Sequence, residues 1–211
     1  FSNVLTKRID RLTRYFAGGA MHKYLCAEHP KIKFLMFLGG HCMSEPCFLI
    51  RSCAPVFMGV KPSAYLRLGT EDIAVLGELM QYCPMKLRAI DDSCENPALI
   101  YIPQLLERAF RQPGVQYFLQ SIGYGGAYVE DYVRELVRRI QGAYRKRNFF
   151  PHEIGIFLGY PLEDVLGFWL SQGRHAKMQG AWKVYSDIGR AAEIQYFYRE
   201  AVRVVDIAVH E

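Results

Sequence analysis

The sequence predicts a predominantly helical α+β protein that forms a single domain with a small sheet of about three strands. Three observations support this fold class. Apolar residues recur at helical spacing in several segments, short runs of β-branched and aromatic residues lie between prolines, and no repeat or linker rich in Pro, Gly or Ser divides the chain. With 211 residues, of which 51% are hydrophobic and 22% charged, the chain can bury one substantial core.

The N-terminal part of the sequence carries two helical patterns. The first covers residues 3–16, with Ser2 as its N-cap and the pair Gly18-Gly19 behind it. Its apolar stripe consists of Val4, Leu5, Ile9, Leu12 and Phe16. The second pattern covers residues 32–38. Both segments are therefore expected to be helical.

Prolines and glycines divide the next region into short elements. Residues 47–68 predict a short helix, a turn and then a strand over 64–68. Residues 71–82 return to helical spacing. The apolar run 98–102 lies between two prolines and predicts a second strand.

Helical patterns dominate the C-terminal half, and the clearest covers residues 128–147. Its apolar stripe should face inward, while its arginines should face outward. The stripe consists of Val129, Tyr132, Val133, Leu136, Ile140 and Tyr144, and the arginines are Arg134, Arg138, Arg139 and Arg145. This helix therefore carries much of the positive charge.

Further elements follow towards the C-terminus. Residues 154–158 and 165–169 predict two short helices joined at a hinge over 159–161. A third strand is predicted over 182–185, and a long closing helix over 188–209.

The bulk composition excludes some classes of protein. No run of about 18 apolar residues occurs, so we expect no membrane span. The 26 Lys and Arg residues exceed the 21 Asp and Glu residues, and the net charge of +5 permits an anionic partner without requiring one. The six cysteines lack the regular spacings of a disulfide-stapled domain, which favours reduced thiols and a cytoplasmic location.

Three stretches of the sequence together carry a family resemblance. They are Cys53-Ala54-Pro55 with Gly59-Val60-Lys61-Pro62, then the long stretch from Phe150 to Phe168, and finally Trp182-Lys183-Val184-Tyr185. In this order they resemble the bacterial family called domain of unknown function 3793.

The resemblance extends over roughly residues 47–198 and implies a small cytoplasmic protein of anaerobic bacteria, with a link to redox or iron metabolism. It supplies no catalytic residue and no cofactor. Because the first forty or so residues fall outside it, we expect residues 1–42 to be an N-terminal helical extension. Residues 43–211 would then form the α+β domain.

The first candidate site is an anion pocket built from the family-like stretches. Pro151 suits the first turn of a helix, where unpaired N–H groups and the helix dipole favour anions. The residues proposed to bind the ligand are Lys61, His152, Glu153, Lys183 and Tyr185. The alternative is that Glu153 caps its own helix, His152 bonds to a carbonyl and both lysines are solvated.

The second candidate is a cysteine-dependent enzyme that uses Cys53 as nucleophile and His152 as base. Residues 152–159 are similar to the histidine-bearing strand of papain-like peptidases. However, no catalytic signature surrounds any cysteine, and buried thiols are common in protein cores.

The third candidate is a metal or haem site near the N-terminus. Its ligands would come from Cys26, His29, His41, Cys42, Cys47 and Cys53. Structural zinc sites usually contain two pairs of closely spaced ligands. Only the pair Cys26 and His29 has such a spacing, so the pattern does not favour a metal.

The fourth candidate is a helix-turn-helix over residues 152–170, in which Gly155, Gly159 and Val165 let two helices meet closely. The second helix would expose Leu162, Glu163, Asp164 and Gly167. Its two carboxylates would repel phosphate, so the sequence does not favour a nucleic-acid partner. The most consistent interpretation is an accessory factor that binds a small anionic molecule or a protein.

Overall fold

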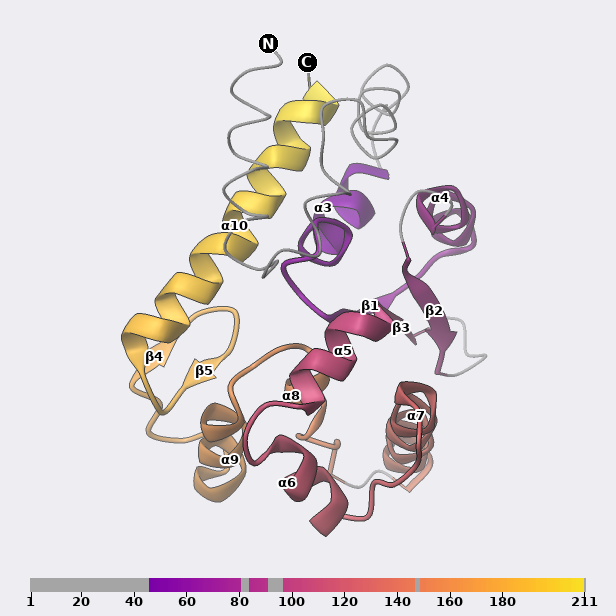
Figure 1. The fold of residues 1–211 in the computed structure, drawn as a ribbon. Helices are drawn as coiled ribbons and strands as arrows, with labels where there is room; N and C mark the ends of the chain where they lie inside the picture. Colours follow the sequence, from indigo (N-terminus) through magenta and orange to yellow (C-terminus); the bar gives the residue numbers. More distant parts are fainter. Residues whose placement is uncertain (1–45, 81–83, 91–96, 147–148, 211) are drawn as a thin grey trace.

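The computed structural model of the chain describes residues 46–80, 84–90, 97–146 and 149–210 (Figure 1). Within these residues the fold is mostly helical, with a small antiparallel sheet of three strands, as the sequence predicts. The predicted helices over 3–16 and 32–38, and the predicted extension 1–42, lie outside the described residues. No described helix is both long and apolar enough to cross a membrane.

The three-stranded sheet has the order β1-β3-β2, with β1 at Ser63–Arg67, β2 at Lys86–Ala89 and β3 at Pro97–Tyr101. Both outer strands pair antiparallel with β3. All five residues of β3 are buried, since this strand is covered on both faces. The predicted strands over 64–68 and 98–102 are thus confirmed. The edge strand β2 was not predicted, because its alternation of exposed charged residues with small apolar ones gives little signal.

The sheet separates two hydrophobic clusters, because successive side chains of a strand point to opposite faces. Ala98 and Ile100 pack with helix α3 at Pro46–Phe57 and helix α10 at Ile188–His210. Leu99 and Tyr101 pack on the other face, against α5 at Pro103–Phe110 and α7 at Val129–Lys146. The protein therefore has a core on each side of the sheet.

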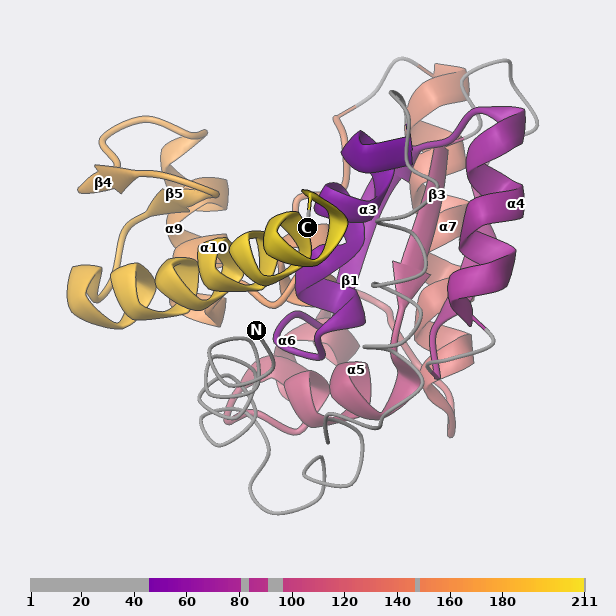
Figure 2. The same ribbon diagram turned by 90° about the horizontal axis from the view of Figure 1, so that it is seen from above.

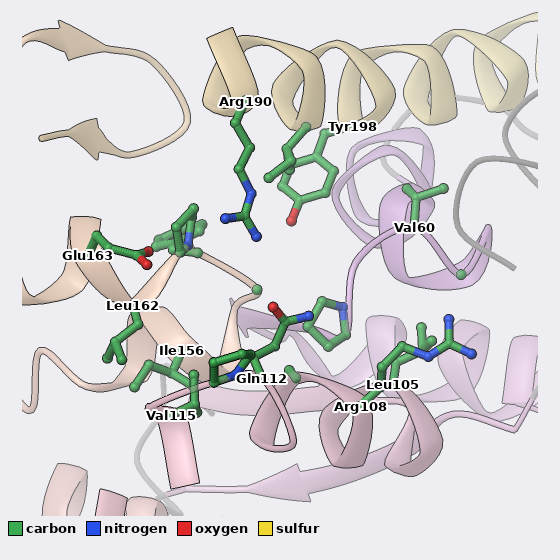
Figure 3. A pocket seen from close by; sticks show the side chains of 18 residues that line it. Val60, Leu105, Arg108, Gln112, Val115, Ile156, Leu162, Glu163, Arg190 and Tyr198 are labelled. Carbon is green, nitrogen blue, oxygen red and sulfur yellow. The ribbon is translucent and has the colours of Figure 1, made fainter. Parts of the chain in front are cut away.

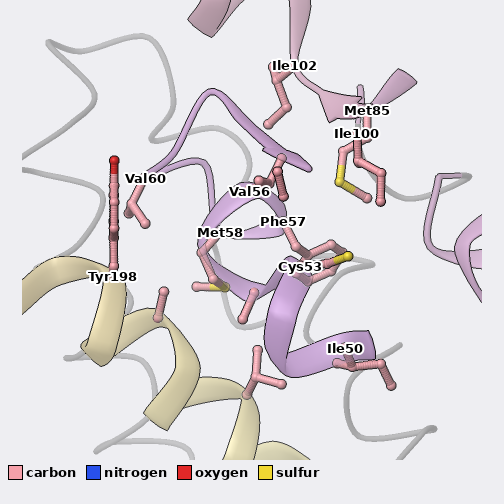
Figure 4. Close-up of a cluster of buried hydrophobic side chains, with 14 of the residues drawn as sticks. Ile50, Cys53, Val56, Phe57, Met58, Val60, Met85, Ile100, Ile102 and Tyr198 are labelled. Carbon is pink, nitrogen blue, oxygen red and sulfur yellow. The ribbon is translucent and has the colours of Figure 1, made fainter. Parts of the chain in front are cut away.

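The first core is built around α3. Figure 4 shows Cys53 of this helix among the side chains of Phe57, Met85 and Ile100. Helix α10 lies along α3 and closes this core, while α4 at Thr70–Met80 contributes the buried Leu76. The helix predicted over 188–209 is confirmed, and so is the one over 71–82 as far as Met80, where the described residues of this segment end.

The second core is built around Phe157, which is fully buried in the short helix α8 at Ile154–Phe157. Phe110 of α5 meets its ring edge to face at 5.0 Å. Leu119 comes from α6 at Val115–Ser121 and Leu136 from α7. The predicted apolar stripe of α7 faces inward, apart from its last member Tyr144, which is exposed.

The C-terminal part adds helix α9 at Leu162–Ser171 and a hairpin of two short strands, β4 at Met178–Gln179 and β5 at Lys183–Val184. Figure 2 shows the hairpin and α9 on the side away from α4 and α7, with α10 running back from the hairpin over α3. The predicted strand over 182–185 exists as β5. It pairs with β4 in a second sheet and does not join the three-stranded one.

Candidate functional site

Two of the family-like stretches meet where the loop after α3 touches the turn between α8 and α9. Gly159 in this turn has a φ of +82°, and a Cβ atom there would lie 2.6 Å from Cδ of Pro62. Only glycine suits both the left-handed backbone and this close approach. The contact fixes the loop 59–62 beside the turn 159–161.

A cavity of about 450 Å³ opens beside this contact, and we call it the central cavity. Its wall includes Val60, Leu105, Gln112, Glu163, Arg190 and Tyr198. Figure 3 shows Arg190 and Tyr198 projecting into it from α10, with Gln112 facing them from beyond α5. The loop after α3, the turn before α9 and residues of α5, α9 and α10 therefore supply one site.

Arg190, an exposed residue at the rim of the central cavity, forms no ion pair with any residue that the structure describes. Its side chain makes no hydrogen bond or ion pair within the described ranges, although its backbone N–H is capped by Asp187. The position is in the first turn of α10, where a cation is unfavourable beside the positive end of the helix dipole. Glu163, the acidic residue among those lining the cavity, forms no ion pair with it.

Lys61 adds a second cation next to the same wall. Its Nζ atom lies 5.5 Å from the ring centre of Tyr198 and 5.9 Å from that of Tyr160, and both tyrosines line the central cavity. No carboxylate of a described residue pairs with this ammonium group. Burial therefore lowers the pKa of Lys61 to about 8.

The two tyrosines remain hydrogen-bond donors over the physiological range. Burial raises the pKa of Tyr198, with a smaller contribution from the neighbouring Tyr160, and burial also raises the pKa of Tyr160. Their hydroxyl groups are therefore protonated at neutral pH.

A second cavity of about 300 Å³ lies between α8, α9 and β5, and we call it the aromatic cavity. Its wall includes His152, Tyr160, Asp164, Phe168, Trp182 and Lys183. Tyr160 also lines the central cavity, so one ring forms part of both walls.

The structure distributes the five predicted ligand-binding residues over four places. Lys61 lies beside the central cavity, and His152 and Lys183 line the aromatic cavity. Glu153 instead turns towards α7, where its carboxylate accepts hydrogen bonds from Arg139 and Tyr124, both at 3.2 Å. Glu153 occupies the N-cap position of α8, but its side chain makes no capping hydrogen bond.

Tyr185, the last of the predicted residues, packs against α9. Its Cβ atom would lie 2.4 Å from a Cβ atom at Gly167. Its hydroxyl group is buried and has no hydrogen-bond partner in the described part of the chain.

Asp164 is a key residue of this region that the sequence did not single out as structural. It is only 1% exposed and accepts hydrogen bonds from Trp182 Nε1, from the Tyr185 and Ser186 backbones and from the Ser186 hydroxyl, all between 2.7 and 2.8 Å. Burial alone would raise the pKa of Asp164, but these hydrogen bonds together hold it below its ordinary value. The ionised carboxylate thus ties β5 to α9.

The thiol of Cys53 lies in the first core and is 0% exposed. His152 lines the aromatic cavity, and residues 154–157 form a helix where a papain-like arrangement would need a strand. A substrate therefore does not reach Cys53 in this fold.

The helix-turn-helix interpretation is right about the bend and wrong about the exposed face. A Cβ atom at Gly155 would lie 2.8 Å from Val165, so α8 and α9 do meet closely. Asp164, however, is buried, and Tyr185 covers Gly167. The would-be recognition helix thus turns Asp164 and Gly167 towards the residues around β5, while Glu163 remains exposed as predicted.

The candidate metal ligands Cys26, His29, His41 and Cys42 lie outside the described residues, and so does the side chain of Cys47. Among the residues that the structure does describe, no group of three His, Cys, Asp or Glu side chains could hold a metal ion.

The fold and the two cavities described above define a small α+β protein with cationic groups beside the central cavity. Residues 49–207 match the model of a family described as "Protein of unknown function (DUF3793)". Because the match covers more than half of the chain, the protein belongs to this family. No curated protein and no solved structure matches the chain.

Proposed function

We propose that the protein binds a small anionic molecule, of the phosphate or polycarboxylate class, in the central cavity. The observation that carries this proposal is the pair of cations Lys61 and Arg190, which lie beside one cavity without an acidic partner among the described residues. The protein would act as a small-ligand-binding accessory factor. The cysteine usage supports a cytoplasmic location for it.

Lys61 is partly buried, and an ammonium group that gives up hydration without gaining an ion pair destabilises a fold. The rings of Tyr160 and Tyr198 compensate only in part, because a cation–π contact contributes about 0.5–2 kcal/mol. A bound anion would supply the missing charge. The free-energy cost of desolvating Lys61 would thus be offset when the residue binds an anionic ligand.

Helix α10 can contact such a ligand through several side chains. Arg190, Ile194 and Tyr198 are spaced by four residues and face the same cavity. The guanidinium group can bind a carboxylate or phosphate through two parallel hydrogen bonds, and the protonated Tyr198 hydroxyl can donate another. Glu163 can accept a hydrogen bond from a hydroxyl group of the ligand.

The proposal is tested by calorimetric titration of the purified protein with inorganic phosphate, pyrophosphate and citrate at constant ionic strength. We expect saturable binding of at least one of them. The substitution Arg190→Ala should weaken that binding about tenfold or more, because a hydrogen bond to a charged group contributes about 1.5–3 kcal/mol.

The matched control is Arg199→Ala on the same helix, because Arg199 is exposed, as Arg190 is, but does not line the central cavity. This variant should bind as the wild type does. Absence of saturable binding by all three anions, or equal affinities for the Arg190→Ala variant and the wild type, would contradict the proposal.

A further inference from the structure

We infer that the aromatic cavity is a separate binding site for a planar aromatic carboxylate of about one ring. The inference rests on different residues from the proposed anion site, apart from the shared ring of Tyr160, and does not depend on that proposal. It concerns the space between α8, α9 and β5.

The walls of the aromatic cavity favour a flat ring. Phe168 meets the His152 ring at 4.9 Å with an interplanar angle of 67°, and Tyr160 stacks on Trp182 at 4.7 Å and 20°. Aromatic pairs in such geometries add about 0.5–1.5 kcal/mol to their area burial. A volume of about 300 Å³ is at the lower end for small-molecule pockets and suits a single ring with one substituent.

Lys183 and His152 both offer N–H donors to this cavity. Lys183 Nζ donates one hydrogen bond, to the Gly173 carbonyl at 2.7 Å, and an ammonium group has three N–H bonds. The imidazole of His152 provides an N–H in either neutral tautomer. A ligand that pairs with these N–H groups must therefore carry hydrogen-bond acceptors.

Asp164 is the acidic residue in the wall of the aromatic cavity. It repels a carboxylate ligand less than an acid without hydrogen bonds would. Its two oxygens already accept four hydrogen bonds from Trp182, Tyr185 and Ser186. Lys183, by contrast, has no carboxylate partner among the described residues. Together the aromatic walls and the remaining N–H bonds of Lys183 and His152 favour a ring that carries a carboxylate.

The fluorescence of Trp182 can report directly on this cavity. The chain contains two tryptophans, and Trp169 is 41% exposed on α9, where it packs against Phe118. In a Trp169→Phe variant all tryptophan fluorescence comes from Trp182. We expect benzoate to change it saturably at neutral pH, whereas benzyl alcohol, acetate and benzylamine should require at least about ten times higher concentrations.

The Lys183→Met substitution in the Trp169→Phe background should weaken benzoate binding about tenfold or more, because it removes the charged donor. The control is Lys177→Met in the same hairpin, since Lys177 donates to the Ser186 carbonyl and does not line the aromatic cavity. That control should bind benzoate unchanged, and so should Arg190→Ala. Circular dichroism verifies that each variant is folded.

The inference is overturned if benzoate leaves the Trp182 fluorescence unchanged, if benzyl alcohol or benzylamine binds as tightly, or if folded Lys183→Met binds benzoate with wild-type affinity. Loss of benzoate binding in Arg190→Ala would instead place the ligand in the central cavity and would also overturn it. Because the central cavity is tested with non-aromatic anions, the two proposals fail separately.

Discussion

At the scale of single residues, Asp164 connects the C-terminal hairpin to the rest of the fold. Its carboxylate satisfies four donors, including two backbone N–H groups. Asp164→Ala would leave these donors without partners, and we expect a loss of about 3 kcal/mol or more in the free energy of unfolding. Glu163→Ala, at the exposed neighbour, should change it by about 0.5 kcal/mol at most. Urea denaturation of both variants measures the difference.

The same residue gives a pH dependence with a definite sign. Because the folded-state pKa of Asp164 is below its ordinary value of 3.8, its contribution to stability is present above about pH 4 and is lost as the pH falls through the lowered pKa. The stability gap between wild type and an Asp164→Asn variant should therefore narrow on acidification. A gap that widens between pH 5 and pH 2 would contradict the assigned role.

Lys61 should give a pH dependence of the same sign in the alkaline range, although here the charged form is the one that folding disfavours. Its pKa is lowered from 10.5 to about 8, so the unfolded chain binds the proton more tightly, and wild-type stability should rise as the pH increases between these values. Lys61→Met should be more stable than the wild type below pH 8, and the difference should shrink towards pH 10.5. Thermal unfolding in the absence of anions tests this, and a variant of wild-type stability at pH 7 would argue against a buried charge.

At the scale of elements, the contact between α9 and β5 depends on a glycine. A Cβ atom at Gly167 would lie 2.4 Å from Cβ of Tyr185, so Gly167→Ala should force the hairpin away and cost about 1–3 kcal/mol. Gly142→Ala in α7 is the control, since no atom lies within 4 Å of its Cβ position. There alanine should stabilise by about 0.5–1 kcal/mol, because it favours the helix. Opposite signs of the two effects in denaturant unfolding are the expected result.

Arg139 joins α7 to its neighbouring elements, although its position in the sequence pattern predicted an outward face. Its guanidinium group donates to Glu153 at 3.2 Å and to the Ile122 carbonyl at 2.5 Å. Because Glu153 is buried, Arg139→Met should cost about 3–5 kcal/mol, and adding Glu153→Gln should restore part of that loss. Arg138→Met is the control, and should cost less than about 1 kcal/mol because the Arg138 side chain is 71% exposed. A strictly additive double variant would show that the pair is not coupled.

The sequence predicted elements better than it predicted their partners. Periodicity identified α7, α10 and β3, because a long stripe or a fully apolar run reports burial directly. It identified β5 but not its pairing with β4, since local pattern carries no information about which strand lies alongside. It also missed that Arg139 is drawn inward, because the buried Glu153 that attracts it is fourteen residues away.

At the scale of the whole molecule, the functional candidates lie where segments distant in sequence come together. Lys61, His152 and Lys183 were identified individually from the sequence, but their division between two cavities depends on the packing of α3, α8 and β5. Arg190 and Tyr198 were missed as site residues. Their spacing of eight on one face of a helix was the available signal, but an apolar stripe on a long helix is usually core.

Lys61 has no carboxylate partner among the described residues, and we propose that an anion bound in the central cavity supplies the missing charge. The pKa of the Lys61 amine tests this proposal most directly. NMR of lysine side chains labelled at Cε, assigned with Lys61→Met, should give a pKa of about 8 for Lys61 in the protein without anion. The titration is repeated with a saturating concentration of whichever of the three anions binds. The pKa of Lys61 should then rise, because the negative charge of the bound anion favours the ammonium form. An identical titration of Lys61 with and without the bound anion would contradict the account.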